Sequence, residues 1–463
     1  MGATSTLPWH DRKRRLWLLG LVVPALPFLA GALVQLTGWA GFWWLGPFVV
    51  FGVVPLVDVT LGRDGVNPPD EAIAWLERDQ WYRWCTYLFL PLQYAGLAFA
   101  CSRWSSGLSG PGALGLALTI GCVAAVGINT AHELGHKKDD LEKWLGKIAL
   151  AQSCYGHFAV EHNRGHHVRV ATVEDPASAR LGENVWRYLP RSILGGLRSA
   201  WQLETRRLGR RRAVKGASTT WSPLSIRNDV LNAWAMSAAL LGVLILLFGT
   251  AVVPWLAIQA VFGFVLLETV DYLEHYGLLR ERRPDGRYEH VSPAHSWNSD
   301  NLTTNLLLYH LQRHSDHHAY PTRHYQALRS YDEAPQLPAG YATLVLAAWV
   351  PPVWRRIMDH RVVTHYDGDV RRANVHEPAR ARLLARFPVP SRVDARVLLT
   401  TGGAGGRGTA TGRWTCPVCG YTYTEEAGAP REGFSPGTPW TSISDDWNCP
   451  DCGVRDKADF VPL

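Results

Sequence analysis

Six long apolar stretches restrict what this chain can fold into more than any other feature. A helix needs about 20 mostly uncharged residues to cross the hydrocarbon core of a bilayer, where only its own backbone can satisfy its N–H and C=O groups. The chain reaches this length at residues 16–36, 42–61, 84–103, 113–132, 230–249 and 252–272. The first stretch lacks a small-residue cleavage site, so we interpret it as an anchor. The sequence predicts an all-α domain of six membrane-spanning helices.

The distribution of Lys and Arg predicts the orientation of these helices. Basic residues resist translocation, so they mark the cytoplasmic side. They precede the first stretch and gather in the connections after the second and fourth: Arg12, Lys13, Arg14, Arg15, Arg63, Arg78, Arg83, Arg206, Arg207, Arg210, Arg211, Arg212 and Lys215. We therefore expect both termini on the cytoplasmic side of the membrane. Attraction to anionic lipid headgroups accounts for the net charge of +7 without a nucleic-acid partner.

The composition changes after the last apolar stretch. Residues 341–358 are amphipathic but interrupted by Pro351 and Pro352, so we expect them on the membrane surface, with Trp349 and Trp354 at the interface. This predicts a membrane domain over residues 1–360. An Arg- and Gly-rich connector follows at 361–413, and a small soluble domain occupies 414–463. About 50 residues cannot stabilise themselves by core burial alone, which favours a structural metal.

Two Cys-x-x-Cys pairs in the small domain indicate what that metal site is. Four thiolates at this spacing bind one ion, either zinc in a ribbon or a single iron. The pairs are Cys416 with Cys419 and Cys449 with Cys452. The other four cysteines lie in or beside apolar segments, where we interpret them as small buried hydrophobes: Cys85, Cys101, Cys122 and Cys154.

Three histidine clusters sit at the predicted cytoplasmic ends of the membrane domain. Imidazoles four residues apart on a helix point the same way, so each such pair can bind one metal, and an adjacent histidine can reach a neighbouring ion. One zinc is filled by about four ligands, so eight imidazoles indicate two metals. The pairs are His132/His136, His162/His166 and His314/His318, and the adjacent residues are His167 and His317.

The sixth apolar stretch ends in ionisable residues, which are costly inside a membrane and tend to mark function. His275 is a candidate ninth ligand. Glu268, Asp271 and Glu274 could accept the outer N–H of ligating imidazoles, although ordinary polar residues at a membrane boundary would look the same. Neutral imidazoles with a few carboxylates suit iron best, while zinc and copper also accept them.

A zinc protease is the alternative from a different class. His132-Glu133-Leu134-Gly135-His136 matches the His-Glu-x-x-His motif, in which Glu133 would be the general base. Such an enzyme needs only one further ligand and gains nothing from an attached electron carrier. The remaining histidines would then have no role.

Four motifs give the chain a family resemblance: residues 132–137, 161–167, 274–277 and 311–319. Over about residues 10–360 it resembles the integral-membrane alkane monooxygenases (AlkB-type). The resemblance implies a fatty-acid-desaturase/hydroxylase-like domain, a non-haem di-iron centre, and O2-dependent oxidation of medium-chain n-alkanes to primary alcohols. Matched residue by residue, it implies as iron ligands His132, His136, His162, His166, His167, His275, His314, His317 and His318. Asp271 stands where the family is expected to have Asn, and His310 and His324 match no ligand position.

The resemblance leaves one nearby alternative open. Membrane desaturases and related hydroxylases acting on other lipids also carry three histidine clusters. The Glu-His-Tyr-Gly segment at 274–277 and the spacing in the second cluster favour the alkane branch. Long apolar segments beside the metals could enclose a hydrocarbon drawn from the membrane lipid.

The small domain resembles a rubredoxin, through Cys416-Pro-Val-Cys419-Gly-Tyr and Cys449-Pro-Asp-Cys452-Gly. Tyr421, Tyr423, Trp447 and Phe460 are its expected aromatic core. The resemblance implies one iron held by the four cysteines, and a partner flavoprotein, an NAD(P)H-dependent rubredoxin reductase. The domain would pass electrons one at a time to the di-iron centre.

Overall fold

The computed structural model describes residues 9–214, 224–225, 227–284, 286–388, 412–430, 432–445 and 447–463. Most of the expected connector, residues 389–411, lies outside the described residues. Lys215 lies outside them too, as do the side chains of Arg210, Arg211 and Arg212.

Six helices are long and apolar enough to span a membrane, as the sequence predicts. Their ends differ from the predicted ends by four residues at most, as at Gln80 against residue 84. The spans are Leu16–Thr37 with α1 (Val22–Thr37); Ala40–Leu61 with α2 (Leu45–Phe48), a π turn (Val49–Val53) and α3 (Val54–Leu61); Gln80–Ser105 with α5 (Gln80–Tyr87) and α6 (Phe89–Ser105); α7 (Gly110–Gly135); α12 (Asp229–Phe248); and Thr250–His275 with α13 (Val253–His275).

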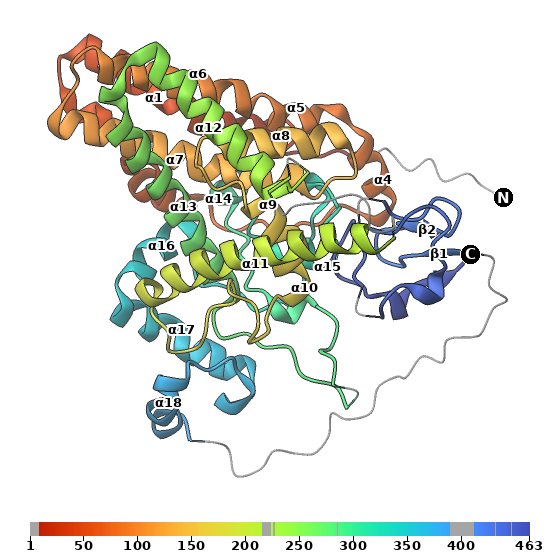
Figure 1. The fold of residues 1–463 in the computed structure, drawn as a ribbon. Coiled ribbons are helices and arrows are strands. Elements are labelled where there is room, and N and C mark those ends of the chain that lie inside the picture. The colour runs from red at the N-terminus through yellow and green to blue at the C-terminus, as the bar shows by residue number, and fades with distance from the viewer. Residues whose placement is uncertain are drawn as a thin grey trace, which may run out of the picture.

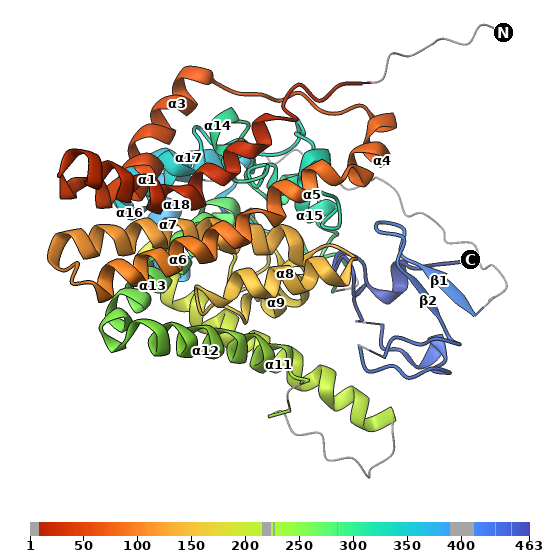
Figure 2. The same cartoon turned by 90° about the horizontal axis from the view of Figure 1, so that it is seen from above.

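The remaining helices pack around this bundle, and the small domain lies at one end of it (Figures 1 and 2). They are α4 (Asp70–Arg78), α8 (Asp140–Ala151), α9 (Phe158–Glu161), a π turn (His162–His166), α10 (His167–Arg169), α11 (Val185–Val214), α14 (Leu302–Leu307), α15 (His314–Ala319), α16 (Tyr341–Trp349), α17 (Pro351–His365) and α18 (Arg380–Arg386). The spanning helices and these shorter helices together enclose the histidine clusters.

Helix α7 is longer than the hydrocarbon core of a bilayer is thick. Its 26 residues make it about 39 Å long at about 1.5 Å per residue, whereas the hydrocarbon core is about 30 Å thick. The helix is long enough for its C-terminal turn, with His132, to extend beyond the hydrocarbon region. The first histidine cluster is therefore placed where polar groups can be satisfied.

Small residues hold α7 against α13. A Cβ added at Gly263 would lie 2.8 Å from the Cβ of Ala124 and 3.3 Å from the carbonyl oxygen of Gly121. Close backbone approach of this kind is how helices pack in lipid, where burying apolar side chains gives little driving force between helices. The contact fixes the relative position of His132 and His275, at the C-terminal ends of these two helices.

The segment expected on the membrane surface packs against the bundle. Its prolines do end one helix and begin the next, α17. However, α16 packs on α13, and Trp354 is buried beside Tyr272 and Tyr276 at ring-centroid distances of 5.3 Å. Trp354 is therefore a core residue and not an interfacial anchor. Periodicity alone could not reveal that α13 offers this segment a partner.

The domain boundary expected at residue 360 falls inside α17. The chain continues to pack on the larger domain after this helix, because Val370, Ala373 and Leu383 are buried in the same hydrophobic core as Met358. The Arg-rich composition suggested a connector here. The apolar residues between the arginines instead pack this segment against the larger domain.

The small domain has a three-stranded antiparallel sheet in the order β2-β1-β3. The strands are β1 (Arg413–Thr415), β2 (Thr422–Thr424) and β3 (Val461–Pro462). Tyr423, Trp447 and Phe460 are buried in its core as predicted, whereas Tyr421 packs against that core and is only partly buried.

Replacing Gly263 by Val tests the contact between α7 and α13. The added methyl groups have no space against Ala124, so we expect the variant to be destabilised by about 1–3 kcal/mol. Gly242→Val on α12 is the matched control, because a Cβ there meets nothing within 4 Å. Thermal unfolding followed by size-exclusion fluorescence should show a lower midpoint for Gly263→Val alone; equal midpoints would contradict the packing.

Candidate metal centres

Nine buried imidazoles from four parts of the chain form two adjacent groups. In each group, one ring nitrogen per histidine lies within 4.8 Å of the others. The groups touch, since the rings of His167 and His318 stack at 4.2 Å. The first group is His132, His136, His162, His167 and His317; the second is His166, His275, His314 and His318. The structure thus brings together every histidine that the sequence predicts as a ligand.

The spacing of the inner nitrogens fits metal ions. His314 Nε2 lies 3.1 Å from His275 Nε2 and 2.9 Å from His318 Nε2, and His167 Nε2 lies 3.0 Å from His162 Nε2. A neutral imidazole has one N–H and one lone pair, so one nitrogen cannot hydrogen-bond productively to several others. The Nε2 atoms of three further histidines are buried and have no hydrogen-bond partner among the described residues: His132, His136 and His166. A cation in each group would be a partner for all these lone pairs.

Burial also keeps the rings in the form that binds metals. Six of the clustered histidines lie outside the spanning helices and show a pKa lowered well below the usual value, first by burial and then by repulsion from neighbouring imidazoles. These are His136, His162, His167, His314, His317 and His318. Neutral imidazoles have free lone pairs, and metal binding requires them.

The pairing within the second cluster differs from the sequence prediction. His162 and His166 were expected to bind one ion, but they belong to different groups. The chain makes a π turn here, with the backbone N–H of His167 bonded to the carbonyl of His162. This wider turn brings His167 beside His162 and directs His166 to the second group. A π turn has no sequence signal that could be separated from an α-helical one.

Two acceptors hold the outer nitrogens of histidines in the second group. Asp175 Oδ2 lies 2.9 Å from His166 Nδ1, and the carbonyl oxygen of His295 lies 3.3 Å from His275 Nδ1. Such partners fix the tautomer and orientation of a ligating ring. Sequence reasoning missed both, because they lie in loops without a distinctive pattern.

The three carboxylates proposed for that role have other contacts. Glu268 accepts a hydrogen bond of 2.6 Å from the hydroxyl of Tyr155. Glu274 Oε2 lies 3.3 Å from His314 Nε2, which is the inner nitrogen and not the outer one. Glu268 and Asp271 instead line a small cavity with His162 and His166. The α13 carboxylates therefore face the metal groups, and the outer hydrogen bonds come from loops.

Glu133 is not placed as the general base of a protease. Its carboxylate pairs with Lys137 Nζ at 2.9 Å and accepts a hydrogen bond of 3.1 Å from the backbone of Tyr325. His132 and His136 share their group with three further histidines. These contacts give Glu133 a structural role beside the site.

The four cysteines of the small domain also converge. Their sulfurs all lie within 4.8 Å of one another, with 3.8 Å between Cys416 and Cys452 and 3.5 Å between Cys419 and Cys449. Four sulfurs placed tetrahedrally at about 2.3 Å from one ion would be about 3.8 Å apart. The site thus fits a single metal ion.

The small domain lies directly against the second histidine cluster. A Cβ added at Gly453, the residue after Cys452, would lie 3.1 Å from the carbonyl oxygen of Asn163 and 3.5 Å from the Cβ of His167. Gly453 also has a φ of +68°, which favours glycine.

Opposite charges surround this contact between the domains. Arg287 pairs with Asp456 and His290 with Asp459, both at 3.3 Å, and Lys138 donates to the carbonyl of Cys419. The basic partners belong to the larger domain and the acidic ones to the small domain. The arrangement orients the four-cysteine site towards the histidines.

An apolar cavity lies on the membrane side of the histidine groups. It has about 700 Å³ of empty volume, and the surface exposed to it is apolar. Its lining includes Asn129 and Leu311, each three residues before a clustered histidine, and it extends along α7 as far as Cys122. A cavity with this apolar lining suits an apolar small molecule.

Comparison with known families agrees with a membrane domain that carries the histidine groups, followed by a small four-cysteine domain. The fatty acid desaturase model matches residues 109–348, and the rubredoxin model matches residues 413–460. Fold and site together therefore define a multi-pass membrane protein of the fatty acid desaturase class, with its histidine-lined metal centre, joined to a rubredoxin whose cysteines bind one iron.

Individual relatives narrow the class. An alkane 1-monooxygenase of Acinetobacter baylyi is 43% identical over 401 residues, covering 84% of this chain and 94% of that protein. One of Pseudomonas putida is 43% identical over 386 residues, covering 83% and 94%. The chain belongs to the alkane 1-monooxygenase family. The C-terminal domain of the chain is similar to rubredoxin 3 of Rhodococcus erythropolis. The two are 64% identical over 50 residues, which cover 11% of this chain and 82% of that protein.

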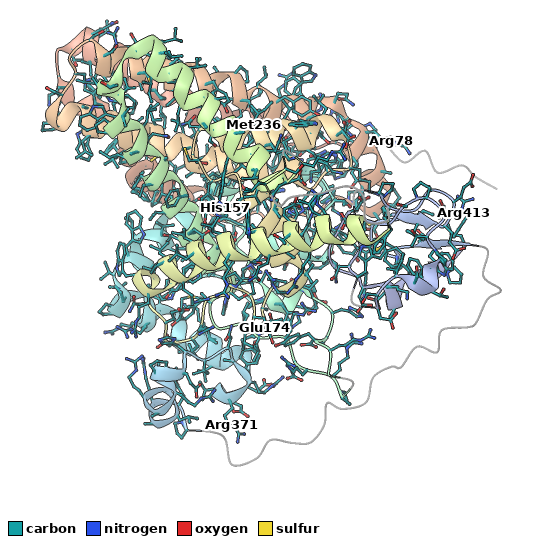
Figure 3. The ribbon with its side chains drawn as sticks, in the orientation of Figure 1. Arg78, His157, Glu174, Met236, Arg371 and Arg413 are labelled. Atoms are coloured by element: carbon teal, nitrogen blue, oxygen red, sulfur yellow. The ribbon has the colours of Figure 1, made fainter. Side chains whose placement is uncertain are left out.

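Changing Asp175 to Asn tests the outer hydrogen bond of the second group. We expect about 10- to 100-fold weaker metal retention there, because the amide is a poorer acceptor for the N–H of His166. Glu174→Gln is the control, since Glu174 contacts Arg282 and Tyr288 on an outer loop (Figure 3). Iron remaining after timed chelation should fall only in Asp175→Asn, and unchanged retention would remove Asp175 from the site.

Proposed function

We propose that this protein hydroxylates the terminal carbon of medium-chain n-alkanes to primary alcohols, using O2 and electrons from its own rubredoxin domain. The observation that carries the proposal is the meeting of three parts at one place. Nine clustered imidazoles lie between an apolar cavity and a docked four-cysteine domain. Family membership over most of the chain supports the same reaction.

We propose all nine clustered histidines as iron ligands, five to one iron and four to the other. Buried, uncharged imidazoles with few carboxylates nearby suit iron. Irons bound there supply the O2 chemistry, in which one oxygen atom enters the C–H bond and the other leaves as water. Asp175 and the carbonyl of His295 orient His166 and His275, and Tyr155 positions Glu268 beside the second group.

The apolar cavity is the proposed alkane site. A hydrocarbon dissolved in the bilayer can be held there by burial of its own surface, without polar contacts. Asn129 lies within one helical turn of His132 on α7, and Leu311 lies three residues before His314, so one end of the cavity is close to both histidines. A methyl C–H is stronger than a methylene C–H, so terminal selectivity depends on presenting the chain end to the metal groups.

Electrons reach the histidines across the contact at Gly453. Cys452 is covalently joined to Gly453, whose backbone packs on Asn163 and His167. This is a short route from a cysteine ligand to an imidazole of the first group. The hydroxylation consumes two electrons and two protons per O2, so the domain must be reduced twice per turnover, by an NAD(P)H-dependent flavoprotein.

The basic residues support a location in the bacterial inner membrane with both ends cytoplasmic. The histidine groups and the small domain then face the cytoplasm, where the reductase is found. We propose three parts for the chain: a membrane domain that includes α17 and α18, a connector after residue 388, and the rubredoxin domain from about residue 413.

The product formed from dodecane under 18O2 tests the reaction. With rubredoxin reductase and reduced nicotinamide supplied, mass spectrometry should find 1-dodecanol carrying the heavy oxygen. A parallel reaction in H218O with ordinary O2 should give unlabelled alcohol. An alkene would place the protein among desaturases acting on this substrate, and no product from iron-loaded protein would contradict the alkane assignment.

Replacing Gly453 by Asn tests the electron route. Asn tolerates a positive φ, so the small domain should still fold, but a side chain here collides with Asn163 and separates the domains. Gly420→Asn is matched, because Gly420 follows the other cysteine pair with a φ of +70° and meets nothing within 4 Å. Stopped-flow reoxidation of the reduced rubredoxin domain in the presence of O2 and dodecane should slow about tenfold or more in Gly453→Asn only. Equal reoxidation rates in the two variants would show that electrons do not pass through the contact at Gly453.

A further inference from the structure

Four arginines surround one pocket on the far side of the larger domain from the rubredoxin. Arg355 and Arg356 come from the first half of α17, and Arg382 and Arg386 come from α18. The pocket has about 750 Å³ of empty volume, and Pro352 completes its lining. Because Leu383 is buried in the same core as Met358, the two helices are held together and the pocket is a fixed feature.

The positive charge of this pocket is only partly neutralised. Arg386 lies 3.4 Å from Asp359 Oδ2, and the other oxygen of Asp359 accepts a hydrogen bond of 2.8 Å from Tyr276. Asp359 itself is buried. Within the described part of the chain, neither Arg356 nor Arg382 forms an ion pair. One carboxylate therefore faces four guanidinium groups.

An exposed apolar strip adjoins the pocket. Leu346, Val350 and Val353 are 40%, 49% and 44% exposed, and they lead along the chain directly to Arg355 and Arg356. Trp186, 54% exposed, joins the strip because its indole N–H donates to the carbonyl of Trp349 at 3.1 Å. Helix α16 packs on the spanning helix α13, so the strip continues the surface that the bundle presents to lipid.

We propose that this pocket binds the headgroup phosphate of an anionic phospholipid, with the acyl chains lying over the apolar strip. Guanidinium groups bind phosphate oxygens through paired hydrogen bonds, and four of them exceed what one carboxylate can balance. A free phosphate would leave the strip uncovered. A zwitterionic lipid would bring its own cation towards the arginines. An anionic lipid satisfies both the charge and the apolar surface.

Native mass spectrometry of the purified full-length protein in detergent tests this site. The probes are phosphatidylglycerol, phosphatidylcholine and inorganic phosphate at equal concentrations. We expect phosphatidylglycerol adducts to exceed phosphatidylcholine adducts about fivefold or more. The double variant Arg356→Gln/Arg382→Gln should lose this excess, since it removes one guanidinium group without a carboxylate partner from each of the two helices.

The control is Arg371→Gln/Arg380→Gln, which removes the same charge from the same part of the chain. Arg371, labelled in Figure 3, pairs with Asp369, and Arg380 pairs with Glu377; neither arginine lines the pocket. It should retain the phosphatidylglycerol excess. An equal loss in both variants would show nonspecific attraction and overturn the site. The site would also be overturned if the unaltered protein showed no excess of phosphatidylglycerol adducts. That result does not depend on any variant folding correctly. Displacement of phosphatidylglycerol by equimolar inorganic phosphate would make it a small-anion site and overturn the lipid assignment.

Discussion

The packing of nine uncharged imidazoles around two small volumes is the constraint on which the rest of the structure depends. Their inner nitrogens approach one another as closely as 2.9 Å, and three have no partner at all. Each buried polar atom left unsatisfied costs about 1–3 kcal/mol, so such an arrangement favours cations strongly. Because the ligands come from distant parts of the chain, metal binding stabilises the tertiary fold as well as the site.

The bilayer imposes the second constraint. Backbone groups inside the hydrocarbon must be bonded within helices, so chemistry is confined to helix ends and to the loops beyond them. Helix α7 carries His132 in its last turn, while α13 ends in His275. The apolar cavity then lies beside α7 and α13, on the lipid side of the same histidines. Substrate and electrons can therefore approach the metals from opposite directions.

Docking of the rubredoxin combines weak charge pairs with one close steric contact. The pairs at Asp456 and Asp459 are partly exposed, and exposed pairs contribute about 0–1 kcal/mol each. The covalent connection compensates, since it raises the effective concentration to roughly the millimolar range. A domain held in this way approaches the histidines closely at Gly453.

The sequence by itself determined the six spans, the identity of the clustered histidines and cysteines, and the resemblance to one enzyme family. Spans follow from length and hydropathy, and ligands from residue type and spacing, which are local properties. Only the tertiary structure decided how His162, His166 and His167 divide between the two groups, because a π turn leaves no local signal. It also decided that Asp175 holds His166, that Trp354 is buried, and that Arg356 and Arg382 share a pocket. Each of these depends on which distant segment packs alongside, and local sequence does not encode that choice.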